Sequence, residues 1–166
     1  MVHENDGAKQ QESRPPELKD ILDLARALNE AGAKYIIIGG IAVIQQGFIR
    51  ATEDIDLLLE NNILNLRRVI EVVAKLPDHA ALEISPEEFS EYDVIRVADE
   101  IVVDLMVRAS NLDYESAKAG IISIDVDGVI IPFASANLLL QMKQGVREKD
   151  VLDRKFLEQR IANLKG

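Results

Sequence analysis

The sequence contains no cysteine, and this absence excludes disulfide bonds, thiolate metal sites and cysteine nucleophiles. A chain without cysteine fits a reducing compartment, so we expect a cytoplasmic protein. Long apolar runs are also lacking: the stretches YIII at 35–38 and GVIIPFA at 128–134 are far shorter than the roughly 20 residues that span a bilayer. We therefore expect no transmembrane helix.

Histidine and clustered basic residues are scarce as well. The two histidines, His3 and His79, do not form the pattern of a typical zinc site. No serine lies in a G-x-S-x-G elbow, which argues against serine catalysis. The formal net charge of −10 argues against a broad basic surface for nucleic acid. Any such contact would have to be local, for example in the basic segment 143–155.

The composition is that of one globular domain. The 166 residues are 48% hydrophobic and 29% charged, enough to build a single core and too few for two ordinary domains. Residues 1–16 are polar and lack the apolar centre of a secretory signal, so we predict a flexible N-terminal tail followed by one domain over 17–166.

Hydrophobic periodicity predicts a mixed α and β order of elements. Apolar residues at helical spacing indicate a helix between the prolines at 15–16 and Gly32. Hairpins are predicted around 98–100 and around Asp127-Gly128, and they argue against an all-parallel sheet. Asn111 is expected to cap a short helix that ends at 119. The remaining strands are predicted at 34–38 and 52–59, and the remaining helices at 41–46, 63–75, 135–144 and 149–164.

Two aspartates bracket one isoleucine in the stretch GGIAVIQQGFIRATEDIDLLL at 39–59. In a strand, alternate side chains share a face, so Asp54 and Asp56 lie together while Ile55 points away. Neighbouring carboxylates repel each other, and a hard divalent cation with oxygen ligands removes that repulsion. Asp104 is a lone charge in the apolar run 101–107, where an unpaired carboxylate is unfavourable, and it is the candidate third ligand.

The glycine pair Gly39-Gly40 directly follows a predicted strand and precedes a predicted helix. Glycine lets backbone N–H groups approach a ligand closely, and a helix N-terminus favours an anion such as phosphate. A phosphate cradle, two metal-binding aspartates and a third acid are together the components of metal-assisted nucleotidyl transfer. Without the acids, the same glycine pair is typical of a tight turn.

The pattern Gly-Gly, then Asp-Ile-Asp, then an acid on a later strand resembles the nucleotidyltransferase superfamily that includes DNA polymerase beta. More narrowly, the stretch at 39–59 resembles the AbiEii-type, toxin-like nucleotidyltransferases, which carry GG-x-A-V, a later Gly, Arg-x-T and D-x-D. The stretch IIPFASANLLLQMKQGVREKDVLD at 130–153 resembles the closing segment of that group, with a lysine-bearing helix before an Arg-x-Lys-Asp. The resemblance covers about residues 17–158 and implies a single-domain α+β fold of the polymerase beta type, with helices flanking a mixed sheet.

The resemblance also implies roles for individual residues. Asp54 and Asp56 match the two metal-binding aspartates, and Asp104 matches the third, which helps to activate the attacking hydroxyl. The implied ion is Mg²⁺, with Mn²⁺ as the alternative, and the implied reaction moves a nucleoside monophosphate from an NTP to an acceptor hydroxyl of RNA, protein or a small molecule. The predicted nucleotide-binding residues are Gly39, Gly40, Arg50, Thr52, Lys143 and Lys149.

Several alternatives stay open at the level of sequence. Arg50 is interpreted either as a phosphate ligand or as a surface ion-pair partner of the neighbouring aspartates. Lys143, Arg147 and Lys149 surround a helix junction, where cations also stabilise a helix C-terminus. The roles of Asp150 and Asp153 are not assigned. For the whole protein, the alternatives to an active transferase are a non-catalytic nucleotide-binding or regulatory module and the toxin of a toxin-antitoxin pair with an antitoxin partner.

Overall fold

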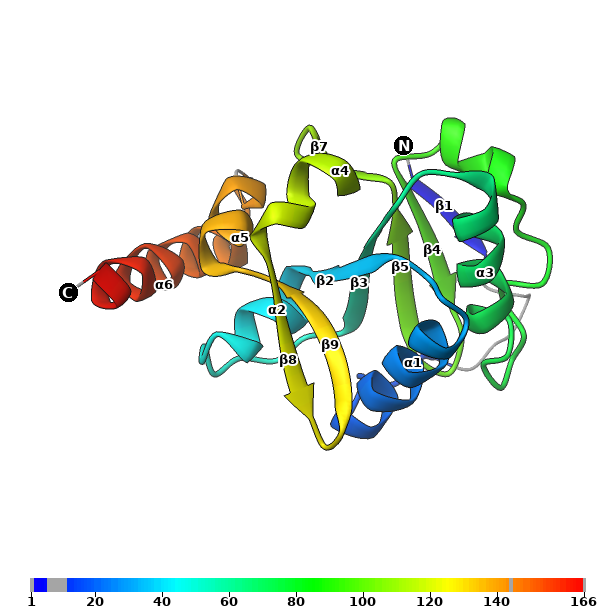
Figure 1. The fold of residues 1–166 in the computed structure, drawn as a ribbon, viewed down its shortest axis with the longest axis horizontal. Helices are drawn as coiled ribbons and strands as arrows, with labels where there is room; N and C mark the ends of the chain where they lie inside the picture. Colours follow the sequence, from blue (N-terminus) through cyan, green and yellow to red (C-terminus); the bar gives the residue numbers. More distant parts are fainter. Residues whose placement is uncertain (1, 6–11, 144, 166) are drawn as a thin grey trace.

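The structure is a computed structural model that describes residues 2–5, 12–143 and 145–165. Its main feature is a seven-stranded mixed sheet with the strand order β1-β4-β5-β3-β2-β9-β8 (Figure 1). The strands are β1 (Val2–Asn5), β2 (Tyr35–Ile38), β3 (Asp54–Leu59), β4 (Val94–Ala98), β5 (Val102–Met106), β8 (Ile121–Val126) and β9 (Val129–Ala134). A small separate hairpin joins β6 (Arg108–Ala109) to β7 (Leu112–Asp113).

Helices flank this sheet, as the sequence predicts for an α+β fold. They are α1 (Leu18–Glu30), α2 (Gly39–Gln45), α3 (Ile63–Val73), α4 (Tyr114–Ala117), α5 (Ala136–Met142) and α6 (Glu148–Lys165), with short 3₁₀ turns at η1 (Pro86–Ser90) and η2 (Lys118–Gly120). Side-chain caps fix several helix starts: the Asn62 side chain accepts from the Asn65 N–H, and that of Ser135 accepts from the Leu138 N–H. Within the described ranges, no helix combines the length and the apolar character needed to cross a membrane.

The central strands supply the core. All four residues of β2 are buried, and Ile55, Leu57, Leu58 and Leu59 of β3 have no exposed surface. Continuous apolar runs of this kind are typical of strands covered on both faces. Asp54 and Asp56 are the polar exceptions, so the sheet is open on one face at the start of β3.

The register aligns charged residues across three neighbouring strands. β3 runs parallel to β5 with Asp56 opposite Asp104, and β4 runs antiparallel to β5 with Arg96 opposite Asp104. Residues aligned across a sheet point to the same face. Asp56, Asp104 and Arg96 therefore form a row on that face, with Asp54 beside it.

The helix α6 extends away from the sheet at one end of the molecule (Figure 1). Its buried residues are Asp150, Asp153 and Leu157, so it lacks the apolar stripe that normally fixes a surface helix. Ion pairs from the two aspartates attach the beginning of this helix to the rest of the protein.

Two sequence-based expectations differ from the structure. The segment 1–16, predicted as a tail, includes β1, which pairs with β4 in parallel. This pairing uses backbone hydrogen bonds, which the side-chain pattern does not predict. Residues 6–11 of the segment lie outside the described residues. The expected cap at Asn111 is wrong. Ser110 and Asn111 both have positive φ and form the turn between β6 and β7, and Asp113 caps α4 by accepting from the Ser116 N–H. A two-residue hairpin turn favours asparagine for this reason.

Candidate active site

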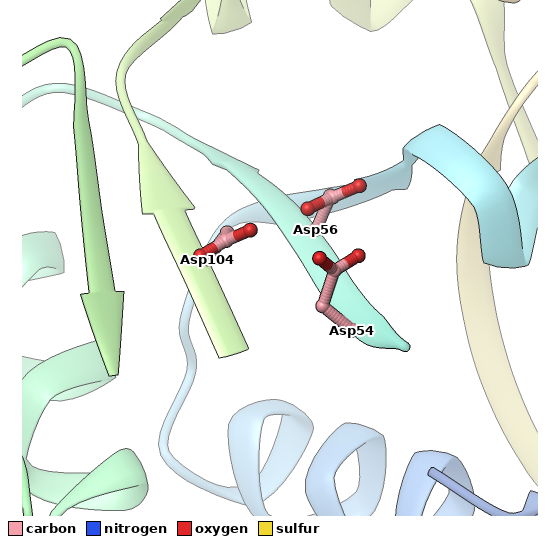
Figure 2. A group of neighbouring side chains, drawn as sticks. All are labelled: Asp54, Asp56 and Asp104. Carbon is pink, nitrogen blue, oxygen red and sulfur yellow. The ribbon is translucent and has the colours of Figure 1, made fainter. Parts of the chain in front are cut away.

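The carboxylates of Asp54, Asp56 and Asp104 converge above the parallel pair β3 and β5 (Figure 2). One oxygen from each lies within 4.8 Å of the others. Asp54 and Asp56 come from alternate positions of one strand, and Asp104 comes from the aligned position of the next. The convergence that the sequence predicts is therefore present in the structure.

Burial and mutual repulsion raise the pKa of two of these groups. The pKa of Asp54 is raised by its removal from water and by the nearby Asp104 charge. Burial, followed by the charges of Asp54 and Asp104, raises the pKa of Asp56 to about 8. Carboxylates this close together repel one another when they are charged, and a bound cation would relieve that repulsion.

Arg96 is a member of the site that the sequence analysis did not identify. Its Nε donates to Asp104 Oδ1 at 2.9 Å, and its Nη2 donates to Asp104 Oδ2 at 3.0 Å. The same Nη2 lies 3.4 Å from Asp54 Oδ2. The alternation in the stretch VIRVA could have indicated its face, because Ile95 and Val97 on either side are buried.

The glycine pair begins α2 and packs tightly against the side chains of the site. Gly39 has a φ of +67°, and a Cβ atom there would collide with the Asp56 carboxylate. A Cβ on Gly40 would lie 2.6 Å from Thr52 Oγ1 and 2.9 Å from Arg50 Nη2. The missing side chains of both glycines therefore make room for other side chains of the protein. The sequence predicts a different role for them, the close approach of a phosphate.

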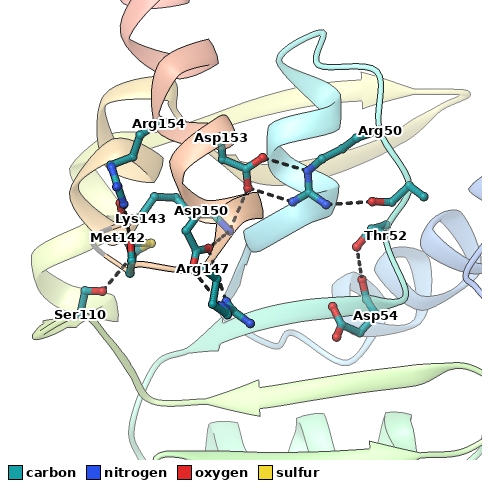
Figure 3. A network of polar contacts seen from close by, with 12 residues as sticks. Arg50, Thr52, Asp54, Ser110, Met142, Lys143, Arg147, Asp150, Asp153 and Arg154 are labelled. Carbon is teal, nitrogen blue, oxygen red and sulfur yellow. Dashed lines mark hydrogen bonds and ion pairs between the residues drawn. The ribbon is translucent and has the colours of Figure 1, made fainter.

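Arg50 is held by Asp153, which lies far away in the sequence (Figure 3). Its Nε and Nη2 lie 2.9 Å from the two oxygens of that fully buried carboxylate. Its Nη1 donates to the Ala51 carbonyl at 2.8 Å. Arg50 therefore forms an ion pair, but with Asp153 of α6 and not with the adjacent aspartates, because the loop directs the guanidinium toward α6.

Lys143 joins the same network. Its Nζ lies 3.2 Å from Asp153 Oδ2 and 3.6 Å from Asp150 Oδ1, and its side chain is only 12% exposed. Arg147 pairs with the second oxygen of Asp150 at 2.9 Å. Asp150 and Asp153 thus hold three cations beside the site, which gives these two unassigned residues a structural role. Their positions on one helix face, three residues apart, are the sequence signal for it.

A cavity of about 390 Å³ adjoins the acids, and all the predicted site residues except Gly39 line it. Its wall includes Thr52, whose Oγ1 donates to the Asp54 carbonyl at 3.4 Å, and the exposed Lys149. A second cavity of about 480 Å³ reaches Gly39 and shares five lining residues with the first, namely Asp56, Arg96, Asp104, Lys143 and Arg147. The second one has more apolar lining residues, namely Ile38, Val94, Met106, Ala109, Leu139, Met142 and Val146.

These residues fit a hard divalent cation. The donor set consists only of carboxylate oxygens, which Mg²⁺ and Mn²⁺ prefer, and it includes no sulfur or imidazole. Asp54, Asp56 and Asp104 are the residues that would hold such an ion. Burial and the neighbouring carboxylates raise the pKa values of Asp54 and Asp56, which is consistent with a site that favours additional positive charge.

Comparison with known proteins adds information on the fold. No family model matches the sequence, and no curated protein matches it. The structure is similar to an antigenic nucleotidyltransferase-like protein from Paracoccidioides brasiliensis, with 18% identity, a TM-score of 0.52 and coverage of 93% of this chain and 89% of that one. It is also similar to a candidate nucleotidyltransferase from Thermotoga maritima, with 18% identity, a TM-score of 0.53 and coverage of 90% and 98%. The chain therefore has the α+β fold of the nucleotidyltransferase-like proteins, a mixed sheet flanked by helices.

Proposed function

We propose that this protein is a metal-dependent nucleotidyltransferase that moves a nucleoside monophosphate from an NTP to an acceptor hydroxyl. The observation that carries the proposal is the convergence of three carboxylate oxygens within 4.8 Å, at the edge of a cavity lined by cations. The fold is compatible with this activity. The AbiEii-type resemblance, a role as a toxin with an antitoxin partner, and a cytoplasmic location stay predictions from the sequence.

In the proposed reaction, the acceptor oxygen attacks the α-phosphorus in line with the departing pyrophosphate. The new bond joins the acceptor oxygen to the α-phosphorus, and the bond between the α-phosphorus and the bridging oxygen to the β-phosphate breaks. A divalent ion supplies charge stabilisation for the entering and departing oxygens when bound. Asp104, which the resemblance assigns to activation of the hydroxyl, would accept the proton.

The chain's own residues position the nucleotide. Lys149 is exposed, lines the cavity and has no ion pair within the described part of the chain, so its ammonium group is accessible to a phosphate. Arg50 uses Nε and Nη2 for Asp153 but still faces the cavity. Cations fixed before the substrate binds stabilise the charge that develops on a transferring phosphoryl group.

The test offers each of the four α-labelled NTPs with Mg²⁺ or Mn²⁺, to the protein alone, with small hydroxyl compounds and with total cellular RNA. We expect label transfer and pyrophosphate release by the wild type, and a loss of at least about 100-fold in Asp54→Asn. The matched control is Asp127→Asn in the β8–β9 turn, whose positive φ asparagine tolerates, and it should keep full activity.

Label transfer that is equal in wild type and Asp54→Asn would contradict the proposed site. If the wild type binds nucleotide without transferring label under any combination, the protein is the non-catalytic nucleotide-binding module. Calorimetric titration with a non-hydrolysable NTP distinguishes that outcome from a protein that binds no nucleotide at all.

A further inference from the structure

Arg96 places a positive charge directly on the acidic cluster. It lies opposite Asp104 in the β4–β5 register, and its guanidinium takes both Asp104 oxygens, at 2.9 and 3.0 Å. Paired N–H donors of this kind match a carboxylate in geometry as well as in charge. Because Nη2 also lies 3.4 Å from Asp54 Oδ2, one guanidinium connects two of the three aspartates.

The surroundings make this contact strong for Asp104. The Asp104 side chain is only 7% exposed, while that of Arg96 is 40% exposed. A nearly buried carboxylate has little water with which to replace a lost partner. Arg96 therefore places a compensating positive charge between Asp104 and Asp54, which without it would face each other as like charges.

A divalent ion held by the aspartates would compete with the contact between Arg96 and Asp54. Both cations need the Asp54 carboxylate, and two like charges at one carboxylate repel each other. The arginine side chain lines both cavities beside the acids and is 40% exposed, so its guanidinium borders open space.

We propose that Arg96 is a built-in counter-ion of the acidic site, which holds Asp54 and Asp104 together without metal and which a divalent ion displaces from Asp54 on binding. This inference rests on the proposed metal-dependent function. Arg96 acts as a positioning residue, and it sets how tightly the site binds metal. An ion must then break an existing contact before it binds, which weakens its apparent affinity.

The experiment measures Mn²⁺ binding to the full chain without nucleotide, by the electron paramagnetic resonance signal of free Mn²⁺. Arg96→Met keeps much of the side-chain length and removes the charge, and we expect it to bind Mn²⁺ on the order of tenfold more tightly than the wild type. Arg96→Lys keeps the charge but loses the paired donors, and its affinity should fall between the two. The control is Arg67→Met on the exposed side of α3, which changes the net charge equally and should bind as the wild type does.

Each result has a distinct meaning. Weaker binding by Arg96→Met, or binding no tighter than that of Arg67→Met, would overturn the proposal, and the wild-type affinity would still support a metal site. If neither the wild type nor Arg96→Met binds Mn²⁺, the proposed metal dependence fails and the inference about Arg96 fails with it. Should Arg96→Met not fold by circular dichroism, Arg96→Lys carries the test, because a merely structural arginine predicts no gain in its affinity.

Discussion

Lys143 and Lys149 lie on the same cavity wall, but their charges are used differently. Lys143 is nearly buried and pairs with Asp150 and Asp153, so most of its charge is already compensated. Lys149 is exposed and unpaired among the described residues. A substrate phosphate is attracted more strongly by a lysine that forms no ion pair, so we propose the direct nucleotide contact for Lys149 and a structural role for Lys143.

This difference predicts opposite consequences for two similar substitutions. Lys149→Met should weaken NTP binding about tenfold and change the free energy of unfolding by less than about 0.5 kcal/mol. Lys143→Met should lower the free energy of unfolding by about 2 kcal/mol, because it leaves the buried Asp153 with Arg50 alone. Calorimetric titration with NTP and urea denaturation measure the two effects, with Lys155→Met on the exposed side of α6 as the control. The proposed roles would be reversed if Lys143→Met kept the stability of the wild type and lost more NTP affinity than Lys149→Met.

At the scale of elements, the junction between β2 and α2 is built around glycine. Positive φ is unfavourable for a residue with a Cβ, and Gly39 adds a second constraint because its missing side chain makes room for Asp56. Gly128 in the β8–β9 turn has a φ of +85°, and a Cβ atom added there would meet no other atom within 4 Å, so it has the first constraint alone. Comparing substitutions at these two glycines separates the effect of backbone strain from the effect of moving Asp56, a proposed metal ligand.

Gly39→Ala and Gly128→Ala are therefore expected to have similar backbone strain but different affinities for Mn²⁺. Both should lose roughly 1 kcal/mol of stability from the left-handed backbone. Only Gly39→Ala should also move the Asp56 carboxylate, and we expect its Mn²⁺ affinity to fall by at least about tenfold. Mn²⁺ titration of both variants under conditions where each is folded measures this. Equal affinities would mean that the position of Asp56 does not depend on Gly39.

The elements of the site differ in how far the sequence predicts them. The strands around Ile37 and Ile55, the Asp127-Gly128 hairpin and the three aspartates follow from local patterns, and the structure brings them together as predicted. Arg96 does not follow from such a pattern, because its place opposite Asp104 depends on the β4–β5 register. The pairing of Arg50 with Asp153 spans most of the chain and depends on how α6 packs, which no short motif encodes.

At the scale of the whole molecule, the acidic site opposes stability. The pKa of Asp56 is raised to about 8, chiefly by burial, whereas an unfolded aspartate ionises near pH 4. Between these two values the folded, metal-free protein retains a proton that the unfolded chain has released. Raising the pH through this window therefore lowers the free energy of unfolding, since the unfolded state binds fewer protons. A bound divalent ion would reverse this effect by stabilising the ionised carboxylate.

Asp56→Asn tests this balance because the amide has nearly the shape of the carboxyl group and does not ionise. In EDTA, the wild type should lose about 2 kcal/mol of unfolding free energy between pH 6 and pH 8, and the variant should lose less, so that the variant is the more stable protein at pH 8. Saturating Mn²⁺ should reverse this order, since an ion at a hundred times its dissociation constant adds about 2.7 kcal/mol to the wild type alone. Urea denaturation at the two pH values, with EDTA or Mn²⁺, gives all the quantities. Parallel pH profiles of the two proteins in EDTA would show that Asp56 ionises as readily in the folded state as in the unfolded one, and the acidic cluster would then impose no penalty for an ion to remove.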